Sequence, residues 1–263
     1  MSQKYETNFK SFRRQLSQSR FLSLTASFSL FIGLFLILNN MVGKFPLLEN
    51  AWIYFVVLIL IIVGSVSAYV YMYDFRIRKA LKALDPILYE HCDPKSYTEY
   101  LEATIRLDKR KDASPSLWMG YLKGLSYLNE KEKMREIVRV HGDILKDKLQ
   151  FQVYKFNLMN ESEQLKQFEP FYDMLSNKLK DKQQLNLLTV RGHLLKHQFE
   201  EANILLSSID TESLSLLDQV SWHTQKAKTL VQLGQFDVAQ THIDFVMDHG
   251  NTSYYVEEVK HLL

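Results

Sequence analysis

Two uninterrupted apolar runs near the N-terminus constrain this chain of 263 residues more than any other feature. The first run covers residues 21–38 and the second 51–73, and neither contains Asp, Glu, Lys or Arg. A hydrocarbon core about 30 Å thick is crossed by roughly 17–25 helical residues. The sequence therefore predicts a transmembrane helical hairpin over 21–73, with a short outer loop at 39–50.

A cleaved signal peptide is the main alternative for the first run. Its basic leader fits, but Asn39-Asn40-Met41 offers no small-residue cleavage site, and a second span follows. A buried hairpin of a soluble protein fits less well, because two fully apolar spans leave little polar face for solvent. We expect a membrane anchor.

Charges beside the spans predict the orientation. The basic N-terminus, 1–20, carries five basic residues and one acid, and 74–85 carries four basic residues and two acids. The loop between the spans holds only Lys44 and Glu49. Because Lys and Arg accumulate in cytoplasmic segments, we expect a two-span plasma-membrane protein whose N- and C-termini are both cytoplasmic.

Small residues within the spans suggest close helix contact, since they let backbones approach in a bilayer. They are Ala26, Ser29, Gly33, Gly64 and Ala68. We expect them to pack the hairpin on itself, and a homo-oligomer or a partner-helix face is the alternative. Neither span holds an ionisable side chain, which argues against transport by this chain alone.

Charge is unevenly divided along the chain. Residues 1–85 hold ten basic and four acidic side chains, whereas 86–263 hold twenty-two and twenty-six. The basic excess suits anionic headgroups of the lipid bilayer, and the acidic tail argues against nucleic-acid binding. Cys92 is the only cysteine, which excludes an intrachain disulfide and is consistent with a reducing compartment.

The tail is predicted to be helical throughout, so the fold class is all-α. Gly and Pro are scarce, and apolar residues recur at three- and four-residue spacing. Helix starts are marked by Asp85-Pro86, Asp93-Pro94 and Ser114-Pro115, each a capping residue followed by proline. We expect a juxtamembrane helical stalk and linker over 74–114, and a helical-repeat domain over 115–263 with a capping helix near 252–262.

One stretch carries a repeat pattern: a small residue, a large one, a Gly-x-aromatic turn and a second small residue. Its members are Ala227, Leu230, Gly234, Phe236 and Ala239. This pattern resembles the tetratricopeptide repeat (TPR) family of helical hairpins. The resemblance implies a TPR-like α-solenoid of stacked helix pairs, and a generic α-solenoid or bundle is the alternative.

The resemblance weakens upstream. Phe199 and Ala202 repeat the second half of the pattern, and Met134 occupies the place of the alanine after Trp118. A degenerate unit over 149–165 fills the gap. These units lack the glycine turn, so only the one over 222–246 matches well.

A row of basic residues follows from aligning the units on Met134, Ala202 and Ala239. Lys123, Arg191 and Lys228 then share the position eleven residues earlier, which in the TPR family lines a concave groove. The resemblance implies a protein partner with an acidic or C-terminal carboxylate segment. It also places Thr224, Val231 and Gln232 in the groove. Ordinary surface lysine and arginine are the alternative.

No catalytic or metal-binding motif stands out. His193 and His197 share a helix face but lack a patterned third ligand, and His91-Cys92-Asp93 is better explained as a capped helix end. No phosphate-binding glycine loop, Gly-x-Ser-x-Gly or His-Glu-x-x-His is present. We expect a protein that is not an enzyme and uses no cofactor.

Two functions fit these features. The first is a bacterial membrane-anchored scaffold that recruits a protein partner through a TPR-like groove. The second is an accessory or regulatory subunit of a membrane transporter or enzyme complex, bound through its hairpin. Fold analogy alone does not decide between them.

Overall fold

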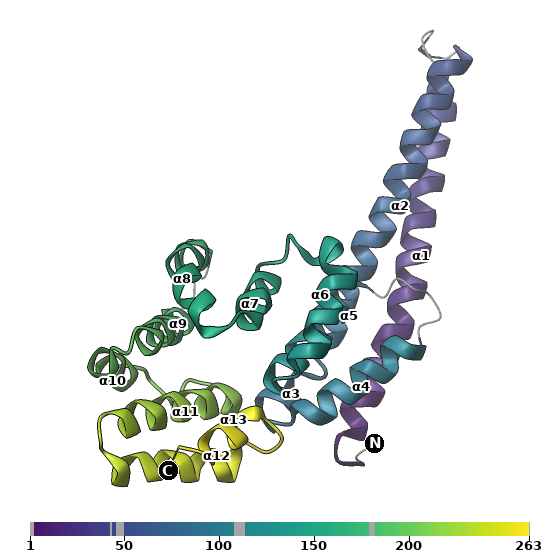
Figure 1. Ribbon diagram of the computed structural model, residues 1–263. Coiled ribbons are helices and arrows are strands. Elements are labelled where there is room, and N and C mark those ends of the chain that lie inside the picture. The colour runs from purple at the N-terminus through teal and green to yellow at the C-terminus, as the bar shows by residue number, and fades with distance from the viewer. Residues whose placement is uncertain (1–2, 43, 46–49, 108–113, 179–181, 263) are drawn as a thin grey trace. The chain divides into compact units, whose positions relative to one another are not determined.

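The computed structural model describes residues 3–42, 44–45, 50–107, 114–178 and 182–262. Every regular element in these ranges is a helix, which confirms the all-α prediction (Figure 1). The chain divides into two compact units. One is Glu6–Ala83, and the other combines the first five residues with Leu84–Leu263.

The first unit is a pair of long helices, α1 (Glu6–Val42) and α2 (Ala51–Leu81). Both are long and apolar enough to cross a membrane, judged by length and composition. Helix α1 begins at Glu6, so the basic segment ahead of the first apolar run is helical as well. The Asn50 side chain caps α2 by accepting a hydrogen bond from the Trp52 amide.

Serines make the close contact between α1 and α2. The Ser27 hydroxyl donates to the Ser65 backbone carbonyl at 2.6 Å, and Ser23 is buried beside them. Near the loop, the Tyr54 hydroxyl donates to Asn39 Oδ1 at 2.9 Å. Side chains this small let the two backbones approach closely.

The predicted packing residues are mostly elsewhere. Ser29, Gly33 and Gly64 are exposed, and a Cβ added at either glycine would meet no atom within 4 Å. Ala26 and Ala68 are partly buried. Our expectation that these small residues pack the hairpin on itself is wrong for the three exposed ones, because the serine face occupies the contact.

The second unit contains eleven α-helices in its described residues, as expected for a tail predicted to be helical throughout. They are α3 (Asp85–Tyr89), α4 (Pro94–Leu107), α5 (Pro115–Tyr127), α6 (Lys131–Leu145), α7 (Leu149–Leu158), α8 (Glu161–Ser176), α9 (Lys182–Leu195), α10 (Phe199–Ser207), α11 (Leu216–Gln232), α12 (Phe236–His249) and α13 (Tyr254–Val259). Helices α3 and α4, expected in a stalk and linker, belong to this compact unit.

Two of the three predicted caps form. Ser114 accepts from the Ser116 amide, and Asp93 accepts from the Ser96 amide at 3.0 Å. Asp85 departs from the prediction because it lies inside α3. Its carboxylate instead forms an ion pair with another helix, as described below.

Consecutive helices pack against one another, and α5 also contacts α7 while α9 contacts α11. The same turn recurs at three junctions between helices. Asn129, His197 and Gly234 all have positive φ, at 56°, 56° and 72°. In each case the next residue donates its amide to the carbonyl five residues earlier, at 2.9–3.1 Å. This is the Schellman pattern, adopted in two cases without glycine.

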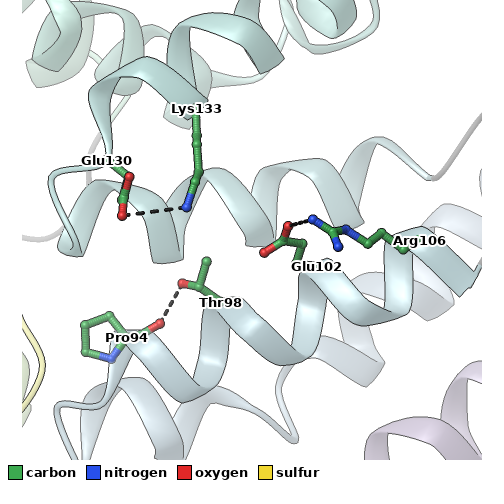
Figure 2. Close-up of polar contacts among 6 residues, drawn as sticks. All are labelled: Pro94, Thr98, Glu102, Arg106, Glu130 and Lys133. Carbon is green, nitrogen blue, oxygen red and sulfur yellow. Dashed lines mark hydrogen bonds and ion pairs between the residues drawn. The ribbon is translucent and has the colours of Figure 1, made fainter.

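Helices α4 and α5 approach closely at Gly124. A Cβ there would lie 2.2 Å from the Thr98 hydroxyl oxygen, so only glycine fits. Thr98 is held in place because its hydroxyl donates to the Pro94 carbonyl at 2.6 Å, as Figure 2 shows. The same view shows the Glu102–Arg106 ion pair along α4 and the Glu130–Lys133 pair at the start of α6.

The end of the helical array is bonded to its beginning. The Asp93 carboxylate, ahead of α4, accepts a hydrogen bond from the Thr252 hydroxyl at 2.8 Å, and Asn251 donates to the His91 carbonyl at 3.0 Å. Helix α11 contacts α3. Tyr5 is fully buried in this unit, with its ring 5.5 Å from that of His91. The second unit therefore closes on itself (Figure 1).

Candidate interaction face

The three basic residues predicted to form a row lie on α5, α9 and α11, and each has a partner within the chain. Lys123 on α5 has its Nζ 3.4 Å from Asp85 Oδ1 and 4.3 Å from the centre of the Tyr89 ring. Both partners belong to α3. Lys123 therefore ties α5 to α3 and is less free than the sequence suggested.

Lys228 on α11 pairs with the C-terminal helix. Its Nζ lies 2.6 Å from Glu258 Oε1 of α13, and the two side chains are 33% and 32% exposed. A pair that keeps this much exposure is screened by solvent, so its contribution to stability is about 1 kcal/mol at most.

Arg191 on α9 is bonded to neutral groups. Its guanidinium donates to Asn157 Oδ1 at 2.6 Å and to Gln164 Oε1 at 2.8 Å, and it lies over the Phe156 ring. Burial lowers the pKa of Arg191, and the groups that oppose this shift, Glu258 among them, come from α13. Lys228 thus has a carboxylate partner, whereas the acceptors of Arg191 are neutral amide oxygens.

The predicted neighbours of this row differ in exposure. Thr224 is buried, and its hydroxyl donates to the Val220 carbonyl at 2.8 Å in the same helix. It is not available to a partner, contrary to the prediction, because it points into the packing of α11. Val231 is partly buried and Gln232 is exposed.

Several buried or partly buried tyrosines that the sequence did not single out lie on α3, α5, α7 and α13. They are Tyr89, Tyr127, Tyr154, Tyr254 and Tyr255. Burial raises the pKa of Tyr127 and Tyr254 well above its usual value, and neighbouring phenols raise it further. They stay neutral hydrogen-bond donors, suited to an anionic or peptide ligand. Only Tyr127, four residues after Lys123 on one helix face, was foreseeable from spacing.

We call this set the inner face: Lys123, Tyr127, Arg191 and Lys228, with Tyr254 and Glu258 of α13 set against it. An open hollow of about 590 Å³ lies beside α13 and is lined by this helix and the turn after α5, with Tyr254 and Glu258 in its wall. Within this face, the Lys228 ammonium already binds the carboxylate of Glu258.

A histidine pair links α11 to α12, and sequence reasoning missed it. The Nδ1 atoms of His223 and His242 lie 2.8 Å apart, and His223 stacks on Phe245. Burial, with the neighbouring histidines, lowers the pKa of His223 to about 4, and burial beside Lys226 also lowers that of His242. Both are therefore neutral at pH 7.

The other candidates from the sequence have structural roles. His193 Nδ1 lies 3.0 Å from Gln198 Oε1, and His197 forms the turn itself. Cys92 is buried, which raises the pKa of its thiol to about 11 and leaves it unreactive at neutral pH. Within the described residues, no group of three or more His, Cys, Asp or Glu is arranged to hold a metal ion.

Comparison with known proteins gives no match to any family model, curated protein or solved structure.

Proposed function

We propose that this protein is a membrane-anchored scaffold that recruits a protein partner through the inner face of its TPR-like unit. One observation carries the proposal: Lys228 of α11 binds the carboxylate of Glu258 from α13, with the two charged atoms 2.6 Å apart. A face that already accepts a carboxylate-bearing helix is suited to an acidic or C-terminal segment of a partner.

The exposure of α1 and α2 supports membrane anchoring. Only 11% and 6% of their most apolar windows are buried. A core helix of a soluble protein has its apolar surface covered by neighbours, whereas a spanning helix presents it to lipid. With the basic flanks, this favours a two-span plasma-membrane protein with both termini in the cytoplasm.

The recurring turn supports a TPR-like arrangement. Beyond Asn129, His197 and Gly234, the residues aligned in the sequence, Met134, Ala202 and Ala239, are all buried. The α7–α8 junction departs from this pattern, since a capping box on Asn160 starts α8 there. The proposed array is therefore three similar helix pairs with one divergent pair inserted.

The test is crosslinking in native membranes followed by affinity capture with the full chain. Fragments are unsuitable, because one that starts after the hairpin loses the buried Tyr5. Charge reversal by Lys228→Glu should reduce partner recovery while helical circular dichroism stays unchanged. Lys133→Glu, at an exposed lysine of α6, is the matched control. Equal recovery by both variants would refute the groove as the binding site.

The exposed small residues of the hairpin favour a second candidate, an accessory subunit of a membrane transporter or enzyme. Gly33 and Gly64 leave open space on the surfaces of α1 and α2, where a partner helix could pack. Under this function, Gly33→Leu and Gly64→Leu abolish capture and Lys228→Glu does not. Under the scaffold function the pattern is reversed.

A further inference from the structure

We propose that α13 is an internal ligand of the inner face, and that a partner with an acidic helix binds by displacing it. Glu258 then occupies the place of the partner's carboxylate. This inference rests on the proposed function and adds its regulation: the face is closed until a competing acidic helix arrives.

The charges on the inner face are incompletely matched by α13. Among the described residues, the polar atoms within hydrogen-bond distance of the Arg191 guanidinium are the neutral amide oxygens of Asn157 and Gln164. Glu258 contacts Lys228, and the neighbouring Glu257 pairs with Lys260 on the outside of α13. Lys228 therefore has a carboxylate partner, whereas the acceptors bonded to Arg191 are neutral. A partner that brings a second carboxylate gains a charge-assisted hydrogen bond that α13 lacks.

Helix α13 is held in a way that allows it to detach from the inner face. The helix has six residues, too few to be stable without its contacts, and its N-cap residue Ser253 makes no side-chain capping bond. Tyr255 and Val259 are its buried anchors. The preceding turn is fixed separately, since Asn251 and Thr252 bond to His91 and Asp93. Helix α13 can therefore leave while the unit stays closed at that turn.

The two sides of the Lys228–Glu258 pair give opposite predictions for ligand binding. The probe is a fluorescent peptide with the sequence of residues 250–263, added to the full chain in detergent or nanodiscs. Removing Glu258 loosens the internal helix and leaves the cations in place, so Glu258→Gln should strengthen peptide binding on the order of five-fold, the upper range for a solvent-screened pair. Lys228→Gln loosens α13 equally but removes a cation, so binding should not strengthen.

Hydrogen exchange supplies the second readout and Glu257→Gln the matched control. Amides of α13 should exchange faster in both Glu258→Gln and Lys228→Gln, and at the wild-type rate in Glu257→Gln, which removes the same charge from the outer side of the helix. The inference is overturned if Glu258→Gln and Glu257→Gln behave alike, or if Lys228→Gln strengthens peptide binding as much as Glu258→Gln. Because the probe is the chain's own segment, this result is independent of whether membrane crosslinking recovers a partner.

Discussion

At the scale of single residues, the protonation state and the steric fit of a side chain depend on neighbours from other helices. His223 and His242 lie nineteen positions apart and meet only because α11 and α12 pack together. Spacing along one helix indicated His193 and His197 instead, which lie in the last turn of α9 and in the turn that follows it. Periodicity identifies residues on a common helix face but not those that meet across two helices.

The histidine pair predicts a loss of stability in mild acid. The folded-state pKa of His223 is about 4, below the usual 6.5, and that of His242 is lowered too. Between these values the unfolded chain binds protons that the folded chain does not, so stability is full above pH 6.5 and falls as pH drops toward 4. His223→Phe, which keeps the stacking on Phe245, should lose less melting temperature between pH 7.5 and 5 than the wild type. An identical loss by circular dichroism contradicts this assignment.

The close approach at Gly124 predicts an asymmetric response to alanine. Gly124→Ala places a Cβ 2.2 Å from the Thr98 hydroxyl oxygen, and the resulting strain should destabilise the protein by about 1–3 kcal/mol, partly offset by better helix propensity. Gly142→Ala on α6 is the control, because its Cβ would meet only Phe151 at 3.7 Å, and it should be neutral or stabilising by up to about 1 kcal/mol. Denaturant unfolding of both variants measures the difference, and equal stability would count against the close contact.

At the scale of elements, local signals predicted the helices of the second unit but not how they meet. Capping residues and apolar spacing fix where helices such as α5 begin and end, because these interactions are local. The turns at Asn129 and His197 were not predicted, because of the three only the one at Gly234 carries the glycine that marks such a turn. Asn and His reach the same left-handed conformation at greater cost. The bond from Thr252 to Asp93 joins residues 159 positions apart, which no local pattern encodes.

That bond predicts a localised loosening. Burial tends to raise the pKa of Asp93, but hydrogen bonds from Ser96 and Thr252 outweigh it and leave the pKa lowered, so the carboxylate is charged at neutral pH. Thr252→Val removes one of these charge-assisted bonds and should cost about 1.5–3 kcal/mol. Hydrogen exchange should then rise near Asp93 and in α13. Thr104→Val, which removes a hydroxyl bonded within α4, should leave hydrogen exchange in α13 unchanged. If exchange in α13 rose as much in Thr104→Val, the Thr252 bond would not be what holds the two ends of the unit together.

The same carboxylate predicts a second acid transition, at lower pH than that of the histidines. A lowered folded-state pKa means that its stability contribution is present above the ordinary value of 3.8 and is lost as pH falls through the folded pKa. In Thr252→Val this contribution should shrink, whereas the loss between pH 6.5 and 4 should persist. Melting temperatures across both windows separate the two groups, and an unchanged low-pH transition would show that Thr252 does not hold the pKa down.

At the scale of the whole molecule, the hairpin was the most predictable part and its internal contacts the least. Two runs without charge suffice to predict two long apolar helices. Which small residues face each other depends on the rotation of each helix about its axis. Ser27 and Ser65 therefore make the contact in place of the predicted Ser29, Gly33 and Gly64, which are exposed.

The membrane topology can be measured directly by cysteine labelling, because the natural Cys92 should not react with the reagent. The thiol of Cys92 is buried and its pKa is raised to about 11, so it should not react with an impermeant maleimide at neutral pH. Lys44→Cys, in the loop between the spans, should then be labelled from outside intact cells, whereas Lys95→Cys, in the second unit, should be labelled only after permeabilisation. The reverse pattern places the helical unit outside the cell, where a cytosolic partner could not reach it. Labelling of both positions without permeabilisation would contradict the two-span anchor. The large exposed apolar surface of α1 and α2 would then lack an explanation.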